Sequence, residues 1–227
     1  ALGQHSRVPM VLIAMGDSGI ASRVLASWMG SAWTYAGDGV APGQVSGEVM
    51  RQEYRFRHIT GHTAVYGVLG RPVTHSVSPA MHNAAFRAAT MDAVYLPLAA
   101  SDFNDFIAFA EAVGLHGASV TAPFKINAFE RADECDPVSR RIQSVNTLRR
   151  EAGRWLGTNT DVSGFLAPLE AAMHLRWREL RREMPVVITF AGGGGSGARA
   201  AAAALEVRGR FTPPAAASSE APWGAAR

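Results

Sequence analysis

The sequence predicts an α/β protein, in which buried strands alternate with helices along the chain. Three observations support this class. Apolar runs of strand length recur, stretches with helical spacing separate them, and 48% of the 227 residues are hydrophobic, which is ample for a packed core. Strands that alternate with helices pair in parallel, so we expect helices on the faces of a sheet and one to two domains.

The first piece, residues 1–60, is expected to hold two strand–helix units. The predicted strands are 8–15 and 31–35, and the helices that follow them are 20–29 and 47–57. Ser46 is a suitable N-cap for the second helix. Two such units cannot close a sheet by themselves.

The middle piece, residues 61–183, repeats this alternation. Ser78 is expected to cap the helix after the first strand, with Pro79 in its first turn. A short turn then joins two later strands into a hairpin. The expected strands are 64–69, 94–98, 117–120, 145–149 and 154–157, and the expected helices are 78–89, 103–113, 123–132 and a segment that starts at 163.

The last piece, residues 184–227, is expected to begin a nucleotide-binding unit. The pattern predicts a strand over 186–190, a glycine-rich loop and an alanine-rich helix that reaches Leu205. After Arg210 the composition becomes low in complexity. A complete nucleotide-binding unit needs further strand–helix pairs, and none follow in this sequence.

Composition excludes several function classes. The formal net charge is only +3, and no basic run is interleaved with aromatic residues, so nucleic acid is not an expected partner. Cys135 is the only cysteine, which excludes a disulfide framework and a cysteine-rich metal site. No apolar run approaches the roughly 20 residues of a membrane span, and no signal peptide opens the chain. We therefore expect a soluble, cytoplasmic protein without a metal or a membrane partner.

Lys125 is the one lysine among the 22 Lys and Arg residues. Arginine stays charged, whereas burial and neighbouring charges can bring lysine to exchange protons near neutrality. The segment 119–125 runs from a strand through a proline into a helix. A lysine at this place, in a chain that uses arginine elsewhere, indicates a chemical role. The alternative is a surface lysine left over in an arginine-rich sequence.

Short polar side chains follow several predicted strands. Ser76 and Ser78 stand two residues apart on a loop that enters a helix, where a polyol or carboxylate would meet the positive helix end. Asn146 and Asp161 each follow a strand run, at the edge where open α/β sheets bind ligands. Lys125 paired with Asp161 suits proton transfer to an alcohol oxygen. The alternatives are a plain helix cap at Ser78 and an ordinary turn before Asp161.

The glycine-rich loop follows a predicted strand and opens a helix, which is the setting of the dinucleotide fingerprint. Gly192, Gly194 and Gly197 have the spacing of that fingerprint, and Gly195 belongs to the same loop. Glycine at these positions allows a tight turn and lets the backbone approach a pyrophosphate at the helix N-terminus.

Together these residues resemble shikimate dehydrogenase over about 65–205. The similarity rests on separate segments in the same order: 66–72, the Ser76 and Ser78 pair, 119–125, 144–147, 159–161 and the glycine loop. The resemblance implies a substrate-binding domain followed by a truncated Rossmann start, and an enzyme that uses NADPH to reduce 3-dehydroshikimate to shikimate in aromatic amino-acid biosynthesis. It further implies that shikimate contacts Ser76, Ser78, Thr121, Asn146 and Asp161, that Lys125 and Asp161 are the catalytic pair, and that Gly192, Gly194, Gly195 and Gly197 hold NADP.

Residues 1–60 resemble a different family, type I 3-dehydroquinate dehydratase. The similarity rests on the segments 15–23 and 41–44, and it implies a C-terminal (βα)2 remnant of a TIM barrel in which Arg23 and Gln44 grip substrate. That family works through a lysine Schiff base. No lysine lies in this segment, so we expect no dehydratase activity from it.

These two resemblances predict a fragment of a fused dehydratase–dehydrogenase. Two alternatives remain open. One is a related dehydrogenase that uses quinate or NAD. The other is a catalytically incomplete module that holds shikimate, because the family places a glutamine on a late helix and no glutamine follows Gln143. The Lys125 and Asp161 pair favours the enzyme.

Overall fold

The computed structural model of the chain describes residues 7–39, 41–168 and 171. The chain divides into two compact units, Ala1–Thr160 and Asp161–Arg227. In the second unit, residues 161–168 are helical. The predicted strand 186–190, the glycine loop and the alanine-rich helix lie outside the described residues.

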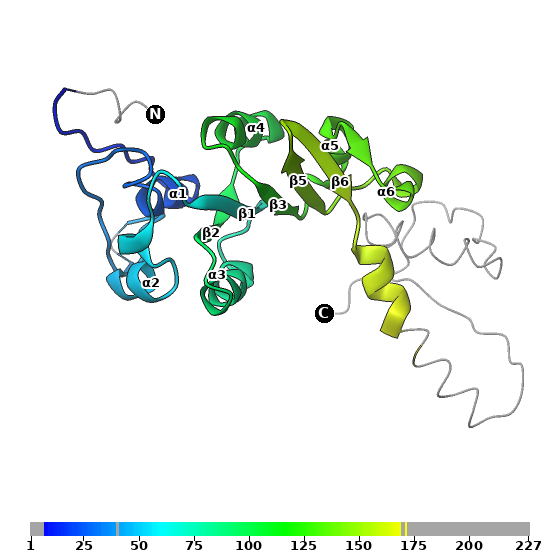
Figure 1. Cartoon of the computed structure of the whole chain (residues 1–227), viewed down its shortest axis with the longest axis horizontal. Helices are drawn as coiled ribbons and strands as arrows, with labels where there is room; N and C mark the ends of the chain where they lie inside the picture. The colour runs from blue at the N-terminus through cyan, green and yellow to red at the C-terminus, as the bar shows by residue number, and fades with distance from the viewer. Residues whose placement is uncertain (1–6, 40, 169–170, 172–227) are drawn as a thin grey trace, which may run out of the picture. The chain divides into compact units, whose positions relative to one another are not determined.

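A six-stranded mixed sheet forms the centre of the first unit, with the strand order β2-β1-β3-β5-β6-β4 (Figure 1). β1 pairs in parallel with β2 and with β3, whereas β5 runs antiparallel to β3 and to β6. The strands are β1 Ala64–Gly70, β2 Ala93–Ala99, β3 Gly117–Val120, β4 Glu134–Cys135, β5 Thr147–Glu151 and β6 Arg154–Thr158. The predicted α/β class is confirmed, and so are the three parallel strands β1, β2 and β3 and the hairpin of β5 and β6.

Helices cover both faces of the parallel part of the sheet, and in Figure 1 α3 and α4 lie on opposite sides of β1 and β2. Two of the helices have acidic N-caps. The Asp102 side chain accepts a hydrogen bond from the Asp105 N–H at 2.9 Å, and the Asp136 side chain accepts one from the Ser139 N–H at 2.7 Å. The helices are α3 Ser78–Ala88, α4 Phe103–Ala112, α5 Lys125–Arg131 and α6 Pro137–Ile142.

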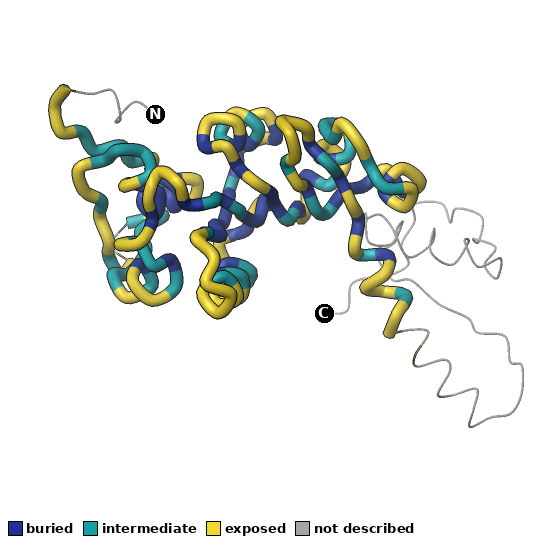
Figure 2. The backbone as a smooth tube through the Cα atoms, in the orientation of Figure 1, coloured by how far each residue is buried: buried dark blue, intermediate teal, exposed yellow. Residues whose placement is uncertain are grey.

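The hydrophobic core lies between the sheet and these helices, and Figure 2 shows that buried residues concentrate along the strands. Trp155, Phe106, Leu69 and Leu96 are each no more than 2% exposed. Full burial of one such side chain contributes about 1.5–3 kcal/mol to stability. Within the described ranges, no helix has both the length and the apolar character that crossing a bilayer requires.

Residues 7–62 differ from the prediction, because the expected strands 8–15 and 31–35 do not form. The two segments meet only through isolated bonds, from the Ala32 N–H to the Met10 carbonyl at 2.7 Å and from the Leu12 N–H to Ser31 Oγ at 3.0 Å. A parallel strand needs a ladder of bonds to a neighbour, and two apolar runs do not supply one. The structure therefore does not confirm the expected barrel remnant.

The helices of this segment are short, namely α1 Ile20–Val24 and α2 Gly47–Gln52. The predicted N-cap of α2 is confirmed, since Ser46 Oγ accepts a hydrogen bond from the Val49 N–H at 3.1 Å. Val24 and Leu25 are fully buried and belong to the same core cluster as β1 and β2. The segment therefore packs onto the sheet without contributing a strand to it.

The start of α3 differs from the prediction in its cap. Val77, and not Ser78, is the N-cap residue, and Ser78 is the first residue of the helix. Ser76 Oγ accepts a hydrogen bond from the Ser78 N–H at 3.2 Å, so the other serine of the pair satisfies this donor. Further along α3, the buried Asn83 amide bonds both backbone groups of Tyr95, at 2.8 Å to its N–H and 2.9 Å to its carbonyl. These bonds fix α3 against β2.

Candidate functional site

The register of the sheet brings the predicted site segments to one edge, at which β1 and β3 end. Leu69 pairs with Val120 at the ends of β1 and β3, which run parallel, so the residues that follow both strands leave at the same edge. β5 is antiparallel and begins there, because Thr147 pairs with Ser119. Thr147 also pairs with Thr158, so β6 ends at this edge. This edge carries the segments of Ser76, Thr121, Lys125 and Asn146, which follow β1 or β3 or precede β5 (Figure 1 shows these strands).

The loops after β1 and β3 are bonded to each other. The Thr121 N–H donates to the Leu69 carbonyl at 2.8 Å, and the Arg71 N–H donates to the Ala122 carbonyl at 3.1 Å. Gly70 has no room for a side chain, since a Cβ there would collide with Thr121 Cγ2. The exposed Thr121 hydroxyl is therefore held at a fixed place beside the end of β1.

Ser76 and Ser78 lie at the N-terminus of α3, both half-buried. The Ser76 N–H donates to the Val73 carbonyl at 3.0 Å, which makes the loop turn back before the helix. Because Ser76 Oγ accepts the bond from the Ser78 N–H, its own proton can be donated to a ligand. Two hydroxyls at the positive end of a helix are suited to a ligand with hydroxyl and carboxylate groups.

Lys125 is the first residue of α5 and is half-buried. Its carbonyl accepts a hydrogen bond from the Val145 N–H at 2.9 Å, and the Val120 N–H donates to the Asn146 carbonyl at 2.7 Å. Before it in the chain, Phe124 is buried in the core. These contacts hold the backbone of Lys125 beside the segment that carries Asn146.

The Asn146 amide is positioned by Thr160, a residue that the sequence analysis included in a motif without giving it a role. Asn146 Nδ2 donates to Thr160 Oγ1 at 2.9 Å, and Asn146 Oδ1 accepts from the Thr160 N–H at 3.0 Å. The Thr147 hydroxyl donates to the same oxygen at 3.0 Å. The role of Thr160 depends on a bond to a residue 14 positions away in the chain, which no local pattern identifies.

A second contribution missed by the sequence analysis is the pair Tyr95 and Ser119. The Tyr95 hydroxyl donates to Ser119 Oγ at 2.8 Å, and the His82 ring stacks on the Tyr95 ring with centroids 4.2 Å apart. Burial raises the pKa of Tyr95, and the bond to Ser119 offsets part of that effect. Ser119 lies in the 119–125 segment, but its partner is 24 residues away in the chain, so no local pattern identifies it.

For two expected parts of the site, the structure does not test the prediction. Asp161 follows Thr160 in the chain and begins the second unit, whereas Lys125 belongs to the first, so the pairing of their side chains stays a prediction. Gly192, Gly194, Gly195 and Gly197 lie outside the described residues, and their contact with a nucleotide also stays a prediction.

Comparison with known proteins gives two family matches. Residues 68–148 match the shikimate dehydrogenase substrate binding domain, and residues 1–61 match type I 3-dehydroquinase. A bifunctional 3-dehydroquinate dehydratase/shikimate dehydrogenase of Arabidopsis thaliana is 36% identical over 171 residues, which cover 73% of this chain and 28% of that protein. A shikimate dehydrogenase (NADP(+)) of Nostoc is 43% identical over 123 residues, or 53% of this chain and 43% of that protein.

Solved structures agree with the first of these matches. Shikimate dehydrogenase from Aquifex aeolicus is 32% identical, with a TM-score of 0.53 over 66% of this chain and 54% of that one. A shikimate dehydrogenase solved with NADP+ is 38% identical, with a TM-score of 0.52 over 65% of this chain and 49% of that one. The chain thus spans less than half the length of the curated relatives named above. The chain is therefore similar to the shikimate dehydrogenase substrate binding domain over residues 68–148 and to type I 3-dehydroquinase over residues 1–61, which confirms both resemblances.

Proposed function

We propose that the protein containing this chain is an NADP-dependent shikimate dehydrogenase, which reduces 3-dehydroshikimate to shikimate. The observation that carries the proposal is the shared sheet edge, where hydroxyl, amide and amine side chains follow strands that end or begin together. Relatives named as NADP-dependent shikimate dehydrogenases support the cofactor and the substrate.

In this proposal, Ser76, Ser78 and Thr121 bind the hydroxyl and carboxylate groups of the substrate. Their hydroxyls both donate and accept, which suits a polyol, and the positive end of α3 favours the carboxylate. Asn146 orients the ring, and its own orientation is held by Thr160.

Lys125 and Asp161 are proposed to handle the proton. Lys125 donates a proton to the carbonyl oxygen as the ketone becomes an alcohol, and Asp161 keeps the amine oriented for that step. The bound NADPH supplies the hydride. Gly192, Gly194, Gly195 and Gly197 are the residues that would hold its pyrophosphate, by the fingerprint spacing alone.

Substitution of Lys125 tests this assignment. We expect Lys125→Met to lower kcat by about 10²- to 10⁴-fold, the usual contribution of a general acid–base group, and to change the KM for shikimate far less. NADPH absorbance during shikimate oxidation gives the rate. Lys125→Arg keeps the charge but cannot exchange the proton, so it should be almost as slow.

Asn127→Ala, an exposed change on the same helix, is the control. Turnover near that of the unchanged protein in Lys125→Met would contradict the assignment.

A second candidate is a shikimate-binding module without turnover, in which the hydroxyl and amide groups at this edge bind the ligand but no hydride is transferred. The two candidates differ in one measurement on the 227-residue chain. Shikimate binding by calorimetry without any NADPH formed would support the module for this polypeptide. NADPH formation at a rate that depends on Lys125 would support the enzyme.

A further inference from the structure

A cavity of about 240 Å³ lies at the opposite end of β1 and β2 from the candidate site. Thr63 and Asp92, which line it, directly precede the two strands, whose first residues Ala64 and Ala93 pair with each other. The volume corresponds to roughly eight water molecules, so the cavity has the scale of a small organic molecule. Nothing in the proposed dehydrogenase reaction uses this end of the sheet.

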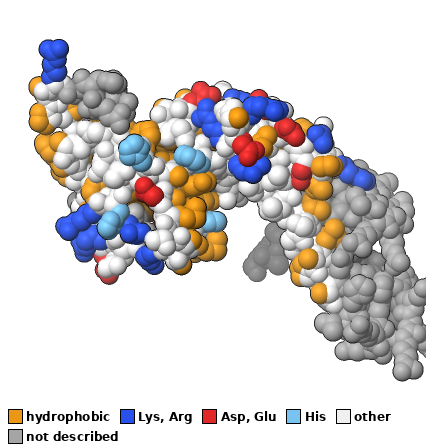
Figure 3. Space-filling view, in the orientation of Figure 1, with side chains coloured by type: hydrophobic (Ala, Val, Ile, Leu, Met, Phe, Trp, Pro, Cys, Tyr) orange, Lys and Arg blue, Asp and Glu red, His pale blue; other side chains and the backbone are white. Residues whose placement is uncertain are grey.

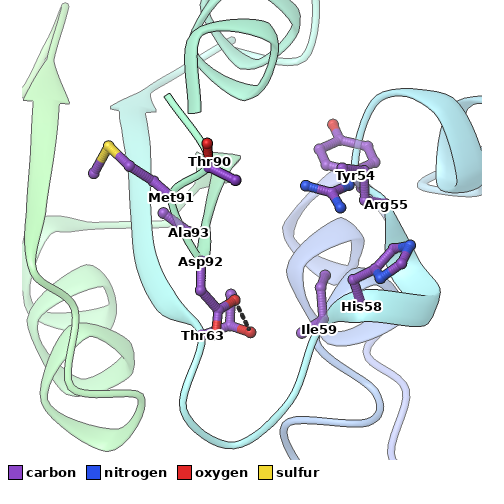
Figure 4. A pocket seen from close by; sticks show the side chains of 9 residues that line it. All are labelled: Tyr54, Arg55, His58, Ile59, Thr63, Thr90, Met91, Asp92 and Ala93. Carbon is purple, nitrogen blue, oxygen red and sulfur yellow. Dashed lines mark hydrogen bonds between the residues drawn. The ribbon is translucent and has the colours of Figure 1, made fainter. Parts of the chain in front are cut away.

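The cavity lies between the two segments that match different families. Tyr54, Arg55 and His58 come from the segment after α2, within the dehydroquinase match, whereas Thr90 and Asp92 come from the segment that enters β2 (Figure 4). A hydrogen bond nearby also joins these segments, from Arg87 Nη1 to the Gln52 carbonyl at 2.9 Å. A ligand here would contact both segments at once.

The walls of the cavity carry opposite charges that do not pair with each other. Asp92 is fixed in place, since its Oδ1 accepts a hydrogen bond from Thr63 Oγ1 at 2.8 Å and Thr63 is only 5% exposed. On the other side, no described residue forms an ion pair or hydrogen bond with the Arg55 guanidinium. The space-filling view shows arginine side chains gathered over the α2 region (Figure 3). A ligand with one anionic and one cationic group would satisfy both walls.

The rest of the lining mixes polar and apolar groups. Tyr54 is 7% exposed and Ile59 is 5% exposed, and both lie on the Arg55 side of the cavity, whereas the Met91 side chain points away from them in Figure 4. Burial, together with the adjacent Glu53 carboxylate, raises the pKa of Tyr54, so its ring carries no charge at neutral pH. The cavity thus has room for an apolar group between the two charged positions.

Two residues that line the cavity have a backbone conformation that their side chains disfavour. Arg55 has φ 51° and Thr90 has φ 57°, and the described chain holds only two other non-glycine residues with positive φ. Thr90 occupies the left-handed position that ends α3, with the Met91 N–H bonded to the Phe86 carbonyl at 2.9 Å. Glycine is usual there, and a β-branched residue is an outlier. Strained backbone of this kind is retained at ligand sites more than elsewhere.

We propose that this cavity binds a small α-amino acid with an apolar side chain. Arg55 and the Thr90 hydroxyl bind its carboxylate, Asp92 binds its ammonium group, and its side chain packs against Tyr54 and Ile59. The proposal is independent of the dehydrogenase reaction, because the cavity and the candidate active site lie at opposite ends of the strands.

Calorimetric titration of the 227-residue chain with L-phenylalanine and L-leucine tests the proposal. N-acetyl-L-phenylalanine lacks the ammonium charge and 2-phenylethylamine lacks the carboxylate, so each should bind at least about tenfold more weakly than L-phenylalanine. No heat from either amino acid at about 10 mM, or equal affinity for the N-acetyl compound, would overturn the proposal.

Matched variants assign the contacts. Arg55→Gly removes the charge and suits the positive φ, and it should weaken L-phenylalanine at least about tenfold. Asp92→Asn keeps an acceptor for Thr63, and it should weaken L-phenylalanine but leave N-acetyl-L-phenylalanine unchanged. Arg57→Gln changes an exposed arginine outside the lining and should have no effect. If Arg57→Gln weakens binding as much as Arg55→Gly, general charge explains the binding and the proposal fails. Shikimate binding, measured in parallel, reports separately on the fold and on the active site.

Discussion

Residues 7–62 and residues 64–160 have similar apolar runs, yet only the second region forms a sheet. Val8 to Met15 is as apolar as the runs that become β1 and β2, but it remains outside any strand. The difference lies in the neighbours. β1 has a strand on each side, and the bonds of its ladder satisfy its backbone, whereas the early runs meet each other through isolated bonds. An apolar run specifies burial, and the presence of partners decides whether it becomes a strand.

The largest expected effect concerns the core of the sheet. Trp155 on β6 is 1% exposed, and Trp155→Ala should lower the free energy of unfolding by about 3–5 kcal/mol. Trp33, in the region without strands, is 55% exposed, and Trp33→Ala should change it by less than about 0.5 kcal/mol. Urea unfolding followed by circular dichroism measures both. Equal losses would mean that the early region is packed as tightly as the sheet.

A second variant tests whether the region without strands contributes to the hydrophobic core. Leu25 is fully buried in the core cluster that includes β1 and β2, although its own segment has no strand. Leu25→Ala should therefore cost about 2–5 kcal/mol, as much as the same change at Leu96 in β2. The same unfolding measurement decides it. A loss of unfolding free energy below about 1 kcal/mol would mean that residues 7–62 do not contribute to the core.

A smaller effect is expected at the cap of α2. Ser46→Ala removes the acceptor for the Val49 N–H, and it should cost about 0.5–2 kcal/mol. Ser46→Asp keeps an acceptor and should be close to neutral. If both variants lose the same stability, the cap is not the cause.

The smallest effect depends on pH. Burial raises the pKa of Glu53 above its ordinary value of 4.5, and a hydrogen bond with Tyr54 offsets part of the rise. A carboxyl with a raised pKa binds more protons in the folded state, so its contribution to stability falls as pH rises through 4.5 and beyond. Glu53→Gln should raise Tm slightly at pH 7, and the gain should vanish well below pH 4.5. Glu48→Gln, at the positive end of α2, should lower Tm instead.

The sheet was predictable because its strands follow local patterns. The runs at 64–69, 94–98 and 117–120 carry enough apolar residues to be recognised alone, and the turn at Gly153 marks the hairpin. β4 has two residues and α6 has six, which is too short for periodicity to register. The Asp136–Pro137 pair at the start of α6, a cap residue followed by proline at the first helical position, is the one local signal for this helix.

The candidate site residues could be predicted from the sequence, but the residues that position them through hydrogen bonds could not. Each of Ser76, Lys125 and Asn146 belongs to a recognisable segment, and parallel strands bring such segments to one edge. Thr160 and Tyr95 act through hydrogen bonds that depend on strand register, which composition does not reveal. The cavity at Arg55 and Asp92 likewise depends on where α3 ends, and on a turn that local rules would assign to glycine.

Asn83 has a consequence for the behaviour of the protein in solution. β2 is the last strand on its side of the sheet, and an exposed edge invites another chain to add a strand. The Asn83 amide bonds both the N–H and the carbonyl of Tyr95, in the middle of that strand. A single side chain thereby occupies two of the hydrogen-bonding positions that an incoming strand would need in the middle of β2, and it makes edge-to-edge pairing there less favourable.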